Sequence, residues 1–140
     1  MEHYDHHYRV LYADTDRMGV TYYGHYFRFF EAARNEYFRA LGLPYTECEK
    51  KGIFLPVGDA HAKYLAPSTY DDDLIIRTSV SHLGASSIRF QYQVIQSKTN
   101  KIITTGETLH VFVDAKMRPC RIPEGIKNKV TVHTLLRGKK

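Results

Sequence analysis

The sequence predicts an α+β fold in which a curved antiparallel β-sheet wraps around one long central helix. Two observations carry this prediction: one long amphipathic segment near the N-terminus and a run of strand-like segments after it. The chain has 140 residues, of which 43% are hydrophobic and 25% charged. This is ordinary for a globular protein, so we expect residues 1–140 to form a single domain.

The long helix is predicted from about His25 to Leu41. One predicted helix face is apolar, formed by Tyr26, Phe29, Phe30, Ala33, Tyr37 and Leu41. The opposite face is polar, formed by Arg28, Glu31, Asn35 and Arg39. Gly42 and Pro44 then favour a helix end. No other segment has this length and regularity.

Five segments have the character of strands: about Asp5 to Tyr12, Phe54 to Leu65, Leu74 to His82, Ser87 to Gln96 and Ile102 to Asp114. The connections between the last three are short, which favours an antiparallel meander. Pro56 and Gly58 interrupt the second segment and indicate an irregular or edge strand. Residues 45–51 resemble short helical turns. The tail is unassigned, because Val130 to Leu136 fits strand or helix.

An acidic turn precedes the long helix. Asp14 and Asp16 stand just before Gly19, which allows a sharp turn and a close approach of ligand to backbone. A helix N-terminus has free N–H groups that stabilise an oxyanion, and a carboxylate from the turn would act on the same centre. The alternative is that both aspartates only form or cap the turn.

The run D-T-D-x-x-G-V-x-Y-Y-x-x-Y-x-x-F-F-E-x-A-R, from Asp14 to Arg34, resembles the signature of the 4-hydroxybenzoyl-CoA thioesterase-like acyl-CoA thioesterases, which have the hotdog fold. A weaker resemblance extends from about Tyr8 to Val113. It implies that Asp16 is catalytic and that the backbone N–H of Tyr23 is the oxyanion donor. Around them, the expected substrate-binding residues are Tyr22, Gly24, His25 and Tyr26.

The sequence departs from the family at His25, where asparagine is usual and would be the better N-cap. Glu31 is a rival carboxylate, because another branch of hotdog thioesterases uses an acidic residue on the helix. The alternative is that Glu31 is only a solvated residue on the surface of the helix. Asp59 and His61 lie in a segment that relatives place beside the helix, so either is a candidate for the acyl pocket.

The turn before the fourth predicted strand resembles the coenzyme A contact region of the family. In some relatives this turn is strongly basic, whereas here Gly84 and Ala85 carry no charge. Contacts to the phosphates of coenzyme A would then come from Ser86, Ser87 and Arg89, or from lysines elsewhere.

The function implied is hydrolysis of a fatty-acyl or aromatic acyl-CoA to the free acid and CoA. Asp16 would be either nucleophile or general base. The alternative is a non-catalytic protein that binds acyl thioesters. Coenzyme A is part of the substrate, so no separate cofactor is expected. The sequence does not specify which acyl group the substrate carries.

A sheet packed on one helix leaves an uncovered edge, and hotdog relatives cover it by pairing. We therefore expect a homodimer or a dimer of dimers (a homotetramer), with the thioester site at the subunit interface.

The net charge of +5 and the pI near 9.2 favour anionic partners. Because the basic residues are scattered, coenzyme A is favoured over nucleic acid. No apolar run reaches the ~20 residues of a membrane span, and no signal segment is present, so we expect a cytoplasmic protein. Cys48 and Cys120 are expected to be free thiols. His3, His6 and His7 lack the spacing of metal ligands, so no metal site is expected.

Overall fold

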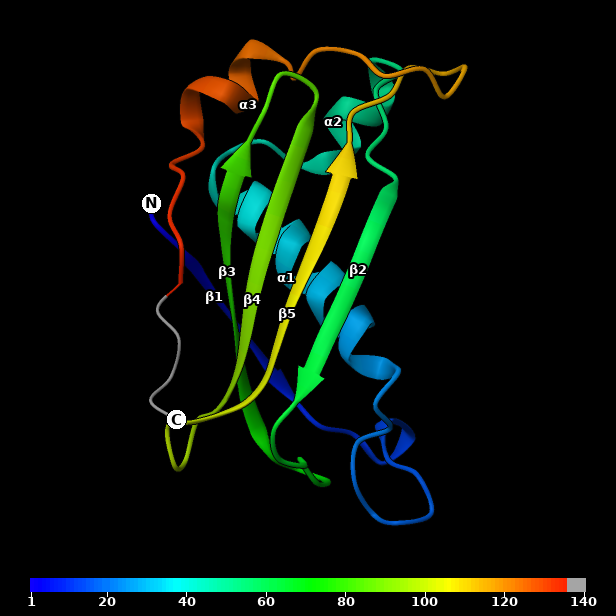
Figure 1. Ribbon diagram of the computed structural model, residues 1–140. Helices are drawn as coiled ribbons and strands as arrows, with labels where there is room; N and C mark the ends of the chain where they lie inside the picture. The colour runs from blue at the N-terminus through cyan, green and yellow to red at the C-terminus, as the bar shows by residue number, and fades with distance from the viewer. Residues whose placement is uncertain (136–140) are drawn as a thin grey trace.

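The computed structural model describes residues 1–135 (Figure 1). Within this range a 3₁₀ turn, η1 (Tyr12–Asp14), accompanies five strands and three α-helices. In chain order these are β1 (Tyr4–Arg9), α1 (His25–Ala40), α2 (Tyr45–Lys50), β2 (Val57–Tyr64), β3 (Asp73–Leu83), β4 (Ser87–Gln96), β5 (Lys101–Val111) and α3 (Glu124–Lys129).

The strands form one sheet in the order β1-β3-β4-β5-β2, and every neighbouring pair of strands is antiparallel. Strands β3 to β5 are the predicted meander, and β1 and β2 add to its two edges. The sheet lies in front of α1 in Figure 1 and curves so that β1 and β3 both contact the helix. The predicted α+β architecture is confirmed.

Helix α1 spans nearly the predicted range and ends one residue early, at Ala40. Gly42 adopts a φ of +75°, which ends the helix as expected. The buried face of α1 matches the predicted apolar face except near the C-terminal end of the helix. There Phe38 is buried and Leu41 is only partly buried. The reason is that α2 packs against this end of the helix and covers Phe38.

The prediction that the first strand continues to Tyr12 is wrong. The chain leaves β1 after Arg9 and enters η1, because the Asp14 carboxylate accepts a hydrogen bond from the Leu11 N–H at 2.9 Å. Tyr12 is therefore not part of the core. Its side chain is 72% exposed and stacks on Tyr70, with 3.6 Å between the ring centroids.

Strand β2 is the predicted edge strand. It pairs with β5 on one side only, and its register shifts between Val57 and Asp59, next to Gly58. Every residue of β2 except Ala62 is exposed. The edge is thus open to another strand.

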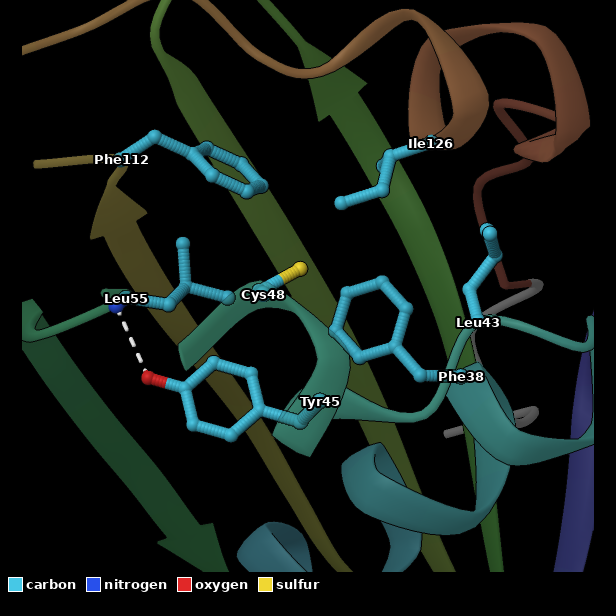
Figure 2. Close-up of a pocket in the computed structure, with 7 residues that line it drawn as sticks. All are labelled: Phe38, Leu43, Tyr45, Cys48, Leu55, Phe112 and Ile126. Carbon is cyan, nitrogen blue, oxygen red and sulfur yellow. Dashed lines mark hydrogen bonds between the residues drawn. The ribbon is translucent and has the colours of Figure 1, made fainter. Parts of the chain in front are cut away.

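The unassigned tail contains α3, which closes one end of the molecule. Figure 2 shows the apolar cluster where the end of α1, α2, α3 and the segment after β5 meet. Its side chains leave no space for a water molecule, and the Tyr45 hydroxyl accepts the Leu55 N–H at 2.9 Å. Farther along, Val132 pairs with Val80 of β3. Residue 136 lies outside the described residues.

A chain of hydrogen bonds fixes α1 on the sheet. Arg34 donates to the Tyr92 hydroxyl at 3.0 Å. The Tyr92 hydroxyl in turn lies 2.7 Å from the Thr108 hydroxyl. Thr108 lies 2.8 Å from Nε2 of His110, whose Nδ1 is 3.1 Å from the Leu55 carbonyl oxygen. Burial lowers the pKa of His110 to about 4, so the ring is neutral. Because a carbonyl only accepts, Nδ1 carries the proton and Nε2 accepts one from Thr108. Each group in this series of hydrogen bonds therefore donates to the next, from Arg34 to the Leu55 carbonyl.

These hydrogen bonds predict that Thr108→Val destabilises the fold by about 1–3 kcal/mol, because it leaves the Tyr92 hydroxyl without an acceptor and Nε2 of His110 without a donor. Thr104→Val is the matched control. Thr104 is also buried on β5, but its hydroxyl has no hydrogen-bond partner in residues 1–135, so losing it costs nothing. Urea unfolding measures both variants. Equal stability of the two would contradict the role given to the chain.

Candidate active site

The loop that carries Asp16 is a closed turn. Thr15 and Thr21 form a β-bridge at its base, and the Asp16 N–H donates to the Val20 carbonyl at 2.9 Å. The Gly19 N–H donates back to the Asp16 carbonyl at 2.9 Å, with Gly19 at a φ of +79°. A side chain at this φ would be strained, which explains the glycine.

The Asp16 carboxylate is half-buried and held by one oxygen. Its Oδ1 accepts the Met18 N–H at 2.8 Å. Its other oxygen, Oδ2, has no partner in residues 1–135. The group is therefore oriented but free to act on a ligand.

Asp14, by contrast, is buried and fully engaged. Its carboxylate accepts from the Tyr8 hydroxyl at 2.5 Å, from the Leu11 N–H and from Arg28 of α1. Burial disfavours the charged carboxylate, but these donors outweigh it and lower the pKa of Asp14 below its ordinary value. The carbonyl oxygen of Asp14 also accepts the Tyr22 N–H at 2.8 Å. Asp14 thus ties β1, η1 and α1 together.

A second buried contact holds the other side of the loop. The Ser68 hydroxyl lies 2.6 Å from the Thr21 hydroxyl and 2.8 Å from that of Tyr26 on α1. The Thr21 N–H also donates to the Ser68 carbonyl at 2.8 Å. The segment between Asp16 and Tyr23 is therefore fixed from two sides.

The start of α1 presents unused donors. The His25 N–H donates to the Tyr22 carbonyl at 3.0 Å, and the Tyr26 N–H reaches the Tyr23 carbonyl at 3.3 Å. The N–H groups of Tyr23 and Gly24 donate to no acceptor in the described chain. Together with the positive end of the helix, they can hold a developing negative charge.

Residue 25 is not the helix cap. Gly24 is the N-cap, and His25 is the first helical residue, so the expectation that asparagine would cap better at position 25 is wrong. Gly24 is also short of space, because an added Cβ would lie 2.6 Å from Cε2 of Tyr22. The Tyr22 ring makes an edge contact with His25.

The aromatic residues predicted at the site separate into two kinds. Tyr22 and Tyr23 are exposed, at 43% and 61%, and their ring centroids lie 4.8 Å apart. Tyr26 is buried and packs edge-on against Phe29. Only the first two are accessible to a ligand in the isolated chain.

Asp59, His61 and Arg89 lie on the face of the sheet away from α1. Gly106 faces the helix, since an added Cβ would meet the Phe30 ring at 2.4 Å, so its neighbour Glu107 faces outward. Glu107 pairs with His61 at 3.3 Å and with Arg89 at 3.5 Å. Asp59 shares this face by alternation along β2. In one chain these residues do not meet Asp16, and their substrate-binding role stays a prediction.

The turn between β3 and β4, which carries Ser86 and begins β4 at Ser87, lies at the end of the molecule opposite the segment that joins β1 to α1 (Figure 1). The Ser86 carbonyl accepts the Phe112 N–H at 2.7 Å. Strand β3 begins near the site, beyond Ser68, and runs 11 residues to this turn, which is about 35 Å at the rise of a strand. The two serines therefore do not reach Asp16 of their own chain.

Glu31 is exposed on α1 and makes no ion pair within residues 1–135. Across the same range no group of three or more His, Cys, Asp or Glu side chains is placed to hold a metal ion, and no helix is long and apolar enough to cross a membrane. Cys48 and Cys120 are free, as predicted.

Sequence reasoning missed Arg28, Tyr8, Ser68 and Tyr64. The helical pattern placed Arg28 on the solvated face, yet its guanidinium forms an ion pair with Asp14. The Tyr64 hydroxyl on β2 donates to the Tyr23 carbonyl at 3.1 Å, across 41 residues of sequence. No local spacing signals a contact of this kind.

Residues 10–130 match the family model of the thioesterase-like superfamily. The chain belongs to this family. The curated relatives of this thioesterase include the acyl-CoA thioesterase YbgC of Haemophilus influenzae, 34% identical over 122 residues, which are 85% of this chain and 88% of the relative. Such relatives make the protein a thioester hydrolase.

Solved structures agree with the family. The DHNA-CoA thioesterase of Staphylococcus aureus superposes with a TM-score of 0.83 at 31% identity, covering 86% of this chain and 81% of that one. A variant of 4-hydroxybenzoyl-CoA thioesterase in complex with 4-hydroxybenzoyl-CoA gives a TM-score of 0.83 at 22% identity, covering 92% and 99%. The predicted hotdog fold is confirmed for this thioesterase.

We predict that Asp14→Asn lowers the free energy of unfolding at pH 7 by about 1–3 kcal/mol, because buried donors lose their charged acceptor. The folded-state pKa of Asp14 is lowered, so its contribution is full above the ordinary value of 3.8 and is lost as the pH falls through the folded value. The difference between variant and parent should therefore shrink in acid. Denaturant titrations at several pH values measure it.

Asp71→Asn is the control, since within residues 1–135 this exposed aspartate pairs only with the exposed Arg9, and asparagine tolerates its φ of +70°. A loss at Asp14 no larger than at Asp71 would contradict the assignment.

Proposed function

We propose that this thioesterase hydrolyses a fatty-acyl or aromatic acyl-CoA to the free acid and CoA, with Asp16 and the Tyr23 N–H as its catalytic groups. Two observations carry the proposal: one carboxylate oxygen of Asp16 has no hydrogen-bond partner in residues 1–135, and the Tyr23 and Gly24 N–H groups at the start of α1 donate to no acceptor there. Coenzyme A arrives with the substrate, and no separate cofactor takes part. The YbgC relatives are named for acyl-CoA hydrolysis, which supports this substrate class.

In this mechanism the thioester carbonyl oxygen accepts the Tyr23 N–H, which stabilises the charge that develops on it. Asp16 either attacks the carbonyl carbon, giving an anhydride that water then opens, or removes a proton from an attacking water. CoA leaves as a thiolate in both cases. A thiol such as the cysteine side chain has a pKa of about 8.5, far below that of an amine leaving group, so a thiolate needs little protonation to leave.

A single turnover in ¹⁸O-water tests the nucleophilic role of Asp16, because only that role can place ¹⁸O on the enzyme. General-base catalysis places the ¹⁸O in the product acid, as does an anhydride that opens at the acyl carbonyl. A nucleophilic Asp16 whose anhydride opens at the aspartyl carbonyl instead retains the label on the enzyme.

We predict that Asp16→Asn leaves folding intact and lowers kcat about a hundredfold or more. The rival carboxylate is tested by Glu31→Gln, which should have little effect, and Asp71→Asn controls for the loss of a nearby charge. Release of free thiol from short-chain, long-chain and aromatic acyl-CoAs is the assay. A larger loss in Glu31→Gln than in Asp16→Asn would overturn the assignment. Tight acyl-CoA binding without turnover in the parent would indicate the non-catalytic alternative.

We also propose that two copies pair along β2. This strand has one free edge, and the exposed Tyr23, just before α1, contacts Tyr64 of β2. Phe27 of α1 is also exposed. Antiparallel pairing of β2 with its copy would continue the sheet and bring opposite ends of the two subunits side by side. The partner's Ser86 and Ser87 would then lie nearer to Asp16 than those of its own chain.

The expected result is a thermal midpoint that rises with protein concentration, since unfolding and dissociation are then coupled. Sedimentation across the same concentrations measures the mass and separates a dimer from a dimer of dimers. A stable and fully active monomer at micromolar concentration would contradict both the pairing and an interface site.

A further inference from the structure

Tyr64 connects the edge strand to the start of α1. Its hydroxyl donates to the Tyr23 carbonyl oxygen at 3.1 Å. Its ring makes an edge contact with Tyr23, at 5.8 Å between centroids, and a tilted contact with Tyr26, at 5.6 Å. Tyr64 thus bonds to the residue whose own N–H is the proposed oxyanion donor.

The bonded group is the peptide between Tyr23 and Gly24. Its carbonyl oxygen accepts only one other hydrogen bond within the described residues, from the Tyr26 N–H at 3.3 Å, which is long. Its N–H is that of Gly24, which is unused. A peptide is one conjugated unit, so a donor at the oxygen draws electron density from the nitrogen and makes the N–H a stronger donor.

We propose that Tyr64 is a positioning residue for hydrolysis: its hydroxyl holds and polarises the Tyr23–Gly24 peptide, so that the Gly24 N–H joins the Tyr23 N–H as a second oxyanion donor. This inference rests on the proposed function. Tyr64 does not touch the reacting atoms. It acts through the peptide that it bonds.

The state of Tyr64 suits this role. Burial, followed by the neighbouring tyrosines, raises the pKa of Tyr64 above its ordinary value of 10.0. The hydroxyl therefore keeps its proton, and can donate it, across the neutral range. Gly24 is also confined, because the Tyr22 ring lies where a side chain would stand. The donor is held on one side by Tyr22 and at its carbonyl by Tyr64.

Tyr64→Phe tests the proposal, because it keeps the ring and removes the hydroxyl. We expect kcat to fall about three- to tenfold, less than the hundredfold or more for losing a direct donor, with KM unchanged. The thermal midpoint and the sedimented mass should match the parent. Tyr70→Phe is the control, since the Tyr70 hydroxyl has no partner in residues 1–135 and the ring stacks on Tyr12. This control should retain the parent kcat.

A spectroscopic measurement separates polarisation from a merely structural role. The probe is a ¹³C-carbonyl ketone analogue of acyl-CoA, in which a methylene group replaces the thioester sulfur. Bound to the parent, its carbonyl stretch should lie below the value in water, and Tyr64→Phe should shift it part of the way back. An unchanged kcat and stretch in Tyr64→Phe, with an active parent, would overturn the inference and leave the proposed function standing. A parent inactive on every acyl-CoA would overturn both.

Discussion

The structure around the site depends on one buried carboxylate. Asp14 of η1 is 2% exposed, and its charge is stabilised by a hydroxyl from β1, by the N–H of Leu11 just before η1 and by a guanidinium from α1. An uncompensated charge at this depth would be costly, so the three elements are constrained to meet there. The loop with Asp16 and the N–H donors of Tyr23 and Gly24 follow Asp14 in sequence, and the Asp14 carbonyl accepts the Tyr22 N–H. Asp14, which we give no part in the chemistry, therefore constrains where these groups lie relative to one another.

Much of the fold was predictable because its dominant signals are local. The spacing of Tyr26, Phe29 and Ala33 gave the helix, and alternation gave β4 at its observed bounds. The errors came where a tertiary contact prevailed over a local pattern. Tyr12 continues the alternation of β1, yet the Asp14 carboxylate turns the chain away before it. Helix α3 follows two prolines, Pro119 and Pro123, in a polar tail, and it is held by the cluster at Leu43 and Phe38, far away in sequence.

The same division applies to the site. Asp16 and Tyr23 belong to one contiguous motif, so resemblance could propose roles for them, and those roles stay a prediction. Tyr64 and Ser68 could not, because each contacts the loop or helix start through a hydroxyl whose partner lies more than 40 residues away. The outward faces of His61 and Arg89 were also hidden, because the side of a strand that faces the helix depends on register. Gly106, which admits the Phe30 ring, reveals that side only in the structure.

The neutral ring of His110 has a consequence for the range in which the enzyme is stable. Its folded-state pKa is about 4, against an ordinary value of 6.5. At a pH between these two pKa values, His110 binds a proton in the unfolded chain but stays neutral in the folded core. Mild acidification therefore favours unfolding. This sensitivity begins well above the pH at which Asp14 is protonated. A buried histidine outside the candidate site thus makes the fold sensitive to mild acid, above the pH range in which Asp14 is protonated.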